Sequence, residues 1–324
     1  MTAANTNDTW DLDWQTILKP LEQLEECSLC PRDCQADRRS DRLGYCRSGT
    51  GYSVSSIFAH MGEEPVLSGT RGICNIFFTH CNLQCVYCQN YQISRNRGPS
   101  AEEYTELKPI ILQIERLLDK GAHGVGFVSP SHSIPQMQVI MNVLEARGRH
   151  PVYVFNSNAY DRVETIRQFE GRMHVYLPDL KYLDDGLAKR YSDVPRYSEV
   201  ATTALREMFR QKGSNILLCD DGTIESGLII RHLVLPGQVE NSKAVLRFIA
   251  EELSPSVHVS LMSQYYPTYH VADHPQLGRT LLAEEYDEVL EEFERLGFYR
   301  GWVQELSSSS HYRPDFLREK PFGE

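Results

Sequence analysis

Apolar and polar residues follow one another along most of the chain in a pattern that predicts alternating strands and helices. The apolar run Ile76-Phe77-Phe78 predicts a short buried strand, and the segment 101–120 has apolar residues at helical spacing after an acidic first turn. Later stretches repeat this order. The predicted strands are 124–128, 152–155, 173–177, 257–262 and 299–303, and the predicted helices are 134–146, 161–169, 184–191, 199–211, 242–252 and 282–296. Such alternation favours a parallel sheet with helices on its outside.

Two stretches depart from this alternation. Residues 215–235 predict a hairpin that turns at Asp221-Gly222, and the segment after Trp10 has helical spacing interrupted by Pro20, which would break or kink a helix. About six parallel strands fit a partial barrel better than a closed barrel of eight. We therefore expect an α/β fold, a partial (β/α)6 barrel that carries a docking helix before it and a polar C-terminal extension after it.

Composition narrows the class of protein. The chain has 324 residues, 41% hydrophobic and 24% charged, enough for one large domain with extensions. Its net charge of −11 and pI near 5.5 disfavour sequence-independent binding to nucleic acid or to an anionic membrane. The N-terminus does not resemble a signal peptide, and the sequence has no long apolar run. We expect a cytoplasmic protein that binds neither nucleic acid nor membrane.

The cysteines indicate metal chemistry. Eight of the nine fall before residue 89, which argues against a secreted disulfide framework and for metal binding in a reducing compartment. The first group, Cys27, Cys30, Cys34 and Cys46, stands among Pro, Gly and charged residues that cannot form a core alone. It predicts a small metal-stabilised lobe. Zinc and a second iron–sulfur cluster both suit four thiols, and the spacing does not choose between them.

The second group has the spacing C-x3-C-x2-C and consists of Cys81, Cys85 and Cys88, directly after the first predicted strand. Three thiols on one loop can converge on one metal centre, but they cannot complete the four-thiolate shell of a structural site. One coordination position would be left open, and an open position allows chemistry. The alternatives are a zinc knuckle or reduced core cysteines.

This loop, with Tyr87 just before its third cysteine, resembles the signature of radical S-adenosylmethionine (SAM) enzymes. The resemblance implies that Cys81, Cys85 and Cys88 hold a 4Fe-4S cluster whose free iron binds SAM. Reduction, by a partner such as flavodoxin or ferredoxin, then cleaves SAM to a deoxyadenosyl radical that abstracts hydrogen from a substrate. Tyr87 would lie beside the adenine.

Several segments together, CxLCPRxC, GYC, EEPVLSGTRG and IFFTHCNLQCVYCQNYQIS, resemble an uncharacterised branch related to the pyruvate formate-lyase activating enzymes, over essentially the whole chain. Cys74 stands where that branch leads us to expect a small or hydroxyl residue, so it is either a buried core thiol or near the cluster. The expected organisation is a tail and docking helix (1–26), a cysteine-rich lobe (27–70), the barrel (71–303) and a C-terminal tail (304–324).

Polar residues at the ends of predicted strands are candidate SAM ligands, because ligands gather at the carboxyl ends of strands in β/α barrels. The activating enzymes have a Gly-Gly-Glu-Pro turn after the second strand; here only Pro130 remains, and Ser129 and His132 are candidates, although His132 would equally suit a helix cap. Their Asp-Thr-Asn-Gly segment is matched by Asn156, Ser157 and Asn158, for which an ordinary turn is the alternative.

The motif Asp179-Leu180-Lys181 matches an Asp-Leu-Lys motif that contacts SAM in the activating enzymes. Alternation along a strand puts Asp179 and Lys181 on one side, where the ammonium can reach the SAM carboxylate. A surface ion pair is the alternative. Further along, Arg231 and His232 must face opposite sides, and Arg231 is the candidate for a carboxylate of SAM or substrate. Gln264 stands near the place of a SAM-contacting histidine.

Three functions fit these patterns. The leading one is an activating-enzyme-like radical SAM oxidoreductase that acts on a glycine of a partner protein, on another peptide or on a small molecule. The second is an iron–sulfur protein for electron transfer or sensing that does not cleave SAM, suggested by the missing Gly-Gly-Glu turn. The third is a zinc-stabilised interaction module with a degenerate barrel.

Overall fold

The computed structural model describes residues 10–40, 42–98, 102–310, 313–318 and 321–323. Residues 1–9 of the expected N-terminal tail and residue 101, where a helix was expected to begin, lie outside the described part.

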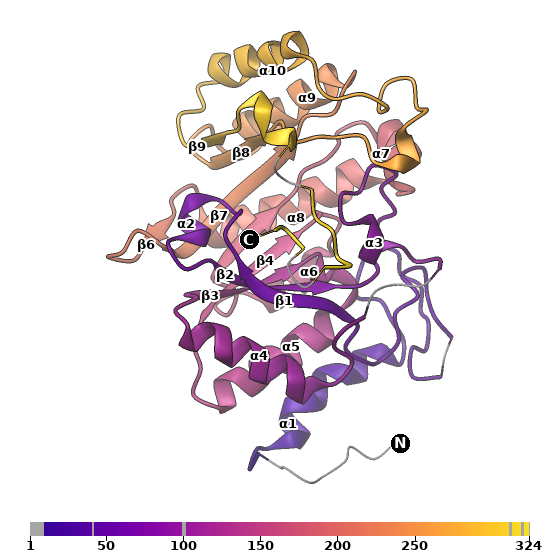
Figure 1. The fold of residues 1–324 in the computed structure, drawn as a ribbon, viewed down its shortest axis with the longest axis vertical. Helices are drawn as coiled ribbons and strands as arrows, with labels where there is room; N and C mark the ends of the chain where they lie inside the picture. Colours follow the sequence, from indigo (N-terminus) through magenta and orange to yellow (C-terminus); the bar gives the residue numbers. More distant parts are fainter. Residues whose placement is uncertain (1–9, 41, 99–101, 311–312, 319–320, 324) are drawn as a thin grey trace.

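The main sheet is open and almost entirely parallel (Figure 1). Its strands are β1 (Val54–His60), β2 (Ile73–Phe78), β3 (Gly124–Val128), β4 (Val152–Ser157), β5 (Val175–Pro178), β7 (Ile224–Leu233), β8 (His258–Met262) and β9 (Gly301–Val303), in that spatial order. Pairing is parallel from β2 to β9, whereas β1 is antiparallel to β2. The short β6 (Leu217–Leu218) forms the predicted hairpin with β7. Because β1 and β9 are the two ends of this order, the prediction of an α/β partial barrel is confirmed.

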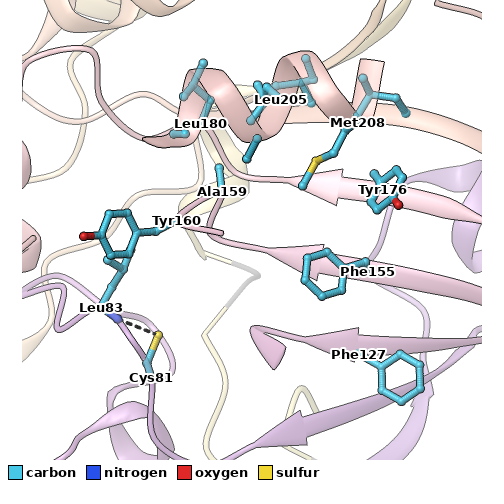
Figure 2. Close-up of a cluster of buried hydrophobic side chains, with 14 of the residues drawn as sticks. Cys81, Leu83, Phe127, Phe155, Ala159, Tyr160, Tyr176, Leu180, Leu205 and Met208 are labelled. Carbon is cyan, nitrogen blue, oxygen red and sulfur yellow. Dashed lines mark hydrogen bonds between the residues drawn. The ribbon is translucent and has the colours of Figure 1, made fainter. Parts of the chain in front are cut away.

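Helices cover the outer face of this sheet. They are α4 (Leu107–Asp119), α5 (Ile134–Ala146), α6 (Val163–Gln168), α7 (Asp185–Ser192), α8 (Tyr197–Lys212), α9 (Val239–Phe248) and α10 (Ala283–Arg295). Short helices stand at the N-terminus and in connections: α1 (Trp14–Leu18), α2 (Pro65–Ser68) and α3 (Tyr91–Ser94). Figure 2 shows aromatic side chains of three neighbouring strands, Phe127, Phe155 and Tyr176, with Leu205 and Met208 of α8 packed over Tyr176.

Alternation along the strands separates this outer core from a smaller inner one. Leu67 of α2 is fully buried among inward-facing residues of four strands, including Ile73, Val154, Val175 and Ile229. The connection between β1 and β2 therefore closes one end of the barrel with an apolar plug. The cavity described below begins above this plug, toward the carboxyl ends of the strands.

The start of one predicted helix differs from the structure, and one observed strand was not predicted. The helix expected over 101–120 begins only at Leu107, because Tyr104 is engaged in backbone pairing with Val54 of β1. The N-terminal helix ends at Leu18 and tightens into a 3-10 helix that contains Pro20, as that proline led us to expect. Strand β1 was not predicted; it lies within the expected lobe 27–70 but pairs with the barrel sheet.

Candidate cofactor-binding site

The loop after β2 carries Cys81, Cys85 and Cys88 and is fixed by backbone hydrogen bonds. The amides of Gln84 and Val86 donate to the carbonyl oxygens of Ser192 (3.1 Å) and Tyr191 (2.8 Å), at the end of α7. Figure 2 shows Cys81 and Leu83 beside Tyr160, beyond the carboxyl ends of the neighbouring strands. The cysteine loop therefore lies at the end of the barrel where parallel strands gather ligands.

Each thiol of this loop receives at least one hydrogen bond. The amide of Leu83 (3.4 Å) and Asn158 Nδ2 (3.5 Å) donate to Cys81 Sγ. The hydroxyls of Ser192 and Ser94 donate to Cys85 Sγ (3.0 Å) and Cys88 Sγ (3.3 Å). Donors aimed at sulfur favour thiolates that serve as metal ligands.

The three thiols border one cavity of about 310 Å³. Burial raises the pKa of Cys81 to about 12 and that of Cys85 to about 11, although Lys181 opposes the shift in both. Both thiols are therefore protonated at neutral pH unless a metal centre takes the place of the proton. We therefore expect these two thiols to release their protons when a metal centre binds.

The three thiols share a space rather than a single point. Within the described residues, no three His, Cys, Asp or Glu side chains form a group that could hold one metal ion. In a 4Fe-4S cluster each cysteine binds a different iron, so such a cluster would need three thiols around a shared space, and Cys81, Cys85 and Cys88 all border the same cavity.

Cys74 does not belong to this set. It is 0% exposed in β2 and packs into the outer core on the helix-covered face of the sheet, as the first of its two readings predicted. Asn75 and Phe77, one and three residues further along the strand, face the opposite side, because side chains alternate along a strand. Cys74 does not line the cavity and so cannot serve as a fourth ligand.

Asp179 and Lys181 face the cavity together, as alternation predicted. Lys181 Nζ lies 2.7 Å from Asp179 Oδ2. Burial opposes the charge of Lys181, but Asp179 and the thiol of Cys85 outweigh it and raise the pKa of the ammonium above its usual value. Tyr197 fixes the pair: its hydroxyl contacts the carbonyl oxygens of Asn158 (2.8 Å) and Asp179 (2.9 Å) and accepts from the amide of Lys181 (3.0 Å).

Most of the other candidate ligands also face this cavity. Its lining includes Tyr87, Ser129, Asn156, Asn158, Arg231 and Gln264. His232, on the opposite face from Arg231, is buried with Nδ1 2.7 Å from the carbonyl oxygen of Leu180 and Nε2 2.9 Å from Ser242 Oγ. His232 is therefore a core histidine whose two ring nitrogens both have hydrogen-bond partners.

Two candidate ligands are placed elsewhere. Ser157 faces away from the cavity, because Asn156 and Asn158 take the inward positions at the end of β4; its hydroxyl accepts from the amide of Ala159. His132 turns its ring back to the carbonyl oxygen of Thr79 (2.7 Å), and burial lowers its pKa to about 3. Neither Ser157 nor His132 is among the residues that line the cavity.

The N-terminal cysteines gather around a different, much smaller pocket of about 10 Å³, which they share with His132 and Arg38. Its cysteines are Cys27, Cys30, Cys34 and Cys46. Burial raises the pKa of Cys30, and the charges of the other three thiols add to that effect. The four residues are thus brought together, but their thiols do not converge on a metal position, and a metal in this lobe remains a prediction.

Sequence reasoning missed the residues that line the far side of the cavity. His60, Glu63 and Glu64 come from the connection between β1 and β2, and both glutamates bind the guanidinium of Arg231. The segment EEPVLSGTRG was noted only for its resemblance. No local pattern marks these carboxylates, because their partner lies 167 residues away or more.

Comparison with known proteins was made by sequence and by structure. The chain is 30% identical over 277 residues to the uncharacterized protein MJ0674 of Methanocaldococcus jannaschii. The matched region covers 83% of this chain and 74% of that protein. The chain belongs to the family of MJ0674. No model of a known protein family matches it.

Solved structures of similar fold include Streptococcus suis SuiB, with 12% identity, a TM-score of 0.46 and coverage of 70% of this chain; the chain spans about half the length of SuiB, 47%. A domain of a pyruvate-formate lyase-activating enzyme from Bacteroides vulgatus has 18% identity, a TM-score of 0.38 and coverage of 56% of this chain and 99% of that domain. TYW1 with a lysine-pyruvate adduct bound has 14% identity, a TM-score of 0.43 and coverage of 73% and 78%.

At these identities the likeness concerns the fold alone. The structure itself places the cysteine loop at the carboxyl ends of the strands of an open parallel barrel. In the described part of the chain, no helix combines the length and apolar character needed to cross a bilayer.

Proposed function

We propose that this protein is a radical SAM enzyme of the activating-enzyme type, in which Cys81, Cys85 and Cys88 hold a 4Fe-4S cluster. The observation that supports this most strongly is that the three thiols and the Asp179–Lys181 pair border one cavity while Cys74 stands outside it. Three ligands leave the fourth iron open to a small molecule. A bound cluster and SAM would supply a deoxyadenosyl radical that abstracts hydrogen from the substrate.

The residues of the chain would bind and orient SAM. Lys181 offers an ammonium to the SAM carboxylate, and Asp179 holds that ammonium in place. Asn158 ties the sites together, since its Nδ2 donates to Cys81 Sγ and its carbonyl oxygen accepts from Tyr197. Tyr87, buried beside Cys88, would contact the adenine and exclude water. The substrate is a glycine of a partner protein, another peptide or a small molecule, and flavodoxin or ferredoxin supplies the electron.

The test compares iron content and SAM cleavage in anaerobically reconstituted proteins. In the variant that carries Cys81→Ala, Cys85→Ala and Cys88→Ala, we expect loss of roughly four irons per chain and of deoxyadenosine formation with a strong reductant. The control is Cys219→Ala, because Cys219 is exposed next to the β6–β7 hairpin and does not line the cavity. Unchanged iron in the triple variant would refute the proposal, and a cluster in the wild type that neither binds nor cleaves SAM would favour the electron-transfer or sensing alternative.

We also propose that residues 27–70 include a lobe stabilised by a metal at Cys27, Cys30, Cys34 and Cys46. Four cysteines around one pocket support a tetrahedral zinc site or a second cluster alike. Metal analysis of the same triple variant separates the two, because any iron that remains must belong to this lobe. Zinc alone at about one ion per chain would identify a structural zinc site.

A further inference from the structure

The cavity has an acidic floor, which we define as Glu63 and Glu64 with their partners Arg231 and Asn75. The connection between β1 and β2 places it there: α2 inserts Leu67 into the inner apolar core, and the two glutamates directly precede α2. Figure 1 shows α2 beside β7, the strand that carries Arg231. The floor thus lies between the apolar plug and the space that the cysteines border.

The floor contains two carboxylates but one cation. Glu64 and Arg231 form an ion pair with two hydrogen bonds. Glu64 Oε1 accepts from Arg231 Nε (2.8 Å), and Glu64 Oε2 accepts from Arg231 Nη2 (2.5 Å). Glu63 shares the same Nη2 and accepts from Asn75 Nδ2 through Oε1 (2.6 Å). The side chains of Arg231, Glu63 and Glu64 are only 12%, 9% and 4% exposed, so water screens their charges only weakly. Burial would raise the pKa of Glu63, but Arg231 outweighs it and lowers that pKa to about 2.

Lys181 and Arg231 are the lysine and arginine side chains among the described residues that line the cavity, and Lys181 does not serve the floor. Lys181 is already paired with Asp179 at 2.7 Å, which leaves the net charge of these five charged side chains at one negative. Two buried carboxylates that share one guanidinium leave a net negative charge, and a buried net charge costs free energy unless it is balanced. The floor therefore favours a ligand that brings a positive charge.

A second observation points to a ligand at the same place. His60 lines the cavity, is 5% exposed, and its Nδ1 has no hydrogen-bond partner. It lies close to Glu63. The backbone also makes room for this arrangement: a Cβ at Gly126 of β3 would come within 2.1 Å of Asn75 Oδ1. Glycine there leaves room for the side chain of Asn75, which donates a hydrogen bond to Glu63.

We propose that the acidic floor recognises a positively charged nitrogen, an ammonium or guanidinium, of a molecule that occupies the cavity, with Glu63 as the carboxylate that meets it. The inference rests on the proposed function in so far as that cavity is the reaction site. Two molecules can bring such a group: a substrate with a lysine-like or arginine-like end, or SAM through its own ammonium. The chemistry is the same, and the experiment separates the two sources.

The experiment measures equilibrium binding to the cluster-loaded full chain under anaerobic conditions, without turnover. The probes are SAM, N-acetyl-lysine methylamide, and the neutral N-acetyl-norleucine methylamide of nearly equal shape. Glu63→Gln removes the charge but keeps an oxygen for Asn75. Glu64→Gln removes one carboxylate from the same floor and serves if the first variant does not fold. Glu199→Gln, at an exposed position paired with Arg196, is the matched control.

If the floor receives a substrate, the lysine probe binds the wild type at least tenfold more tightly than the norleucine probe, and Glu63→Gln abolishes that difference. If it receives SAM, the variant binds SAM at least tenfold more weakly and the two peptide probes do not differ. The inference is overturned if Glu63→Gln binds each of the three probes as tightly as the wild type does. Since no step requires SAM cleavage, a protein that forms no deoxyadenosine can still show this charge selectivity, and the two proposals fail separately.

Discussion

Lys181 is the residue on which SAM binding depends most in the proposed site. Its ammonium lies in the cavity, held by Asp179 at 2.7 Å. In Lys181→Met we expect iron content to stay at the wild-type level and SAM affinity to fall about 10- to 100-fold, since a hydrogen bond to a charged group contributes roughly 1.5–3 kcal/mol. Isothermal titration with SAM checks this. Lys189→Met, at an exposed lysine of α7, is the control and should bind SAM normally; equal affinity in both variants would contradict the assignment.

Cys74 provides a second test at the same scale. Because it packs in the outer core and not in the cavity, Cys74→Ala should keep the full iron content and the full response to SAM. The loss of a buried sulfur should lower the free energy of unfolding by about 1 kcal/mol, the usual size for such a change. Iron analysis and urea denaturation measure the two effects. A variant that loses cluster iron would show that Cys74 is a ligand after all.

Single residues were predictable where alternation along a strand determines their side. Asp179, Lys181 and Arg231 were placed correctly on the inner face for this reason. Ser157 and His132 were not, because a polar residue just after a strand can turn either way and only the packed structure decides. Glu63 and Glu64 carried no signal at all, since their pairing with Arg231 joins residues far apart in the sequence.

At the scale of elements, α8 connects the strand ends to the site through Tyr197. Its hydroxyl contacts the carbonyl oxygens of Asn158 and Asp179 and accepts from the amide of Lys181. Tyr197→Phe leaves that buried amide without a partner, so we expect a loss of about 1–3 kcal/mol in the free energy of unfolding and weaker SAM binding. Urea denaturation and SAM titration measure both. Tyr299→Phe, at a largely exposed tyrosine, should change neither.

Elements with a strong period were found within a few residues, as for the predicted helix 282–296 and the observed α10. Boundaries shifted where tertiary contacts intervene. Pairing of Tyr104 with Val54 delays the start of α4. Strand β1 was missed although YSVSSIFAH is β-branched and apolar in part, because its partner β2 lies beyond the α2 plug and only that pairing makes it a strand.

At the scale of the whole molecule, buried histidines link folding to pH. Burial lowers the pKa of His232 to about 4, although its hydrogen bond to the carbonyl of Leu180 opposes the shift. An unfolded chain binds a proton at this residue below about pH 6.5, whereas the folded protein does not until about pH 4. The contribution to stability is therefore complete above about pH 6.5 and is lost as the pH falls toward 4.

We expect the free energy of unfolding to fall across this window by as much as about 1.4 kcal/mol per pH unit from this residue. Urea denaturation from pH 7 to pH 4.5 in wild type and His232→Gln measures the effect. The variant should be less stable at pH 7 and should lose stability less steeply with acidification. Parallel curves would show that His232 does not titrate differently in the two states.

The overall architecture was the most predictable feature. Short stretches of the sequence already contain its signals, which are the alternating strand and helix periods and a cysteine triplet after the first barrel strand. The sequence patterns did not predict that the β1–β2 connection closes the barrel end, and therefore did not predict the charge of the cavity floor. Those features depend on contacts between distant segments, which no local period reports.

If three thiols leave one cluster iron open to SAM, electron paramagnetic resonance of the reduced, reconstituted protein detects SAM at that iron. With SAM added, we expect a changed 4Fe-4S spectrum in the wild type and in Cys74→Ala, and no such signal in the variant lacking Cys81, Cys85 and Cys88. A 4Fe-4S spectrum that SAM leaves unaltered in the wild type would show that no cluster iron is open to it.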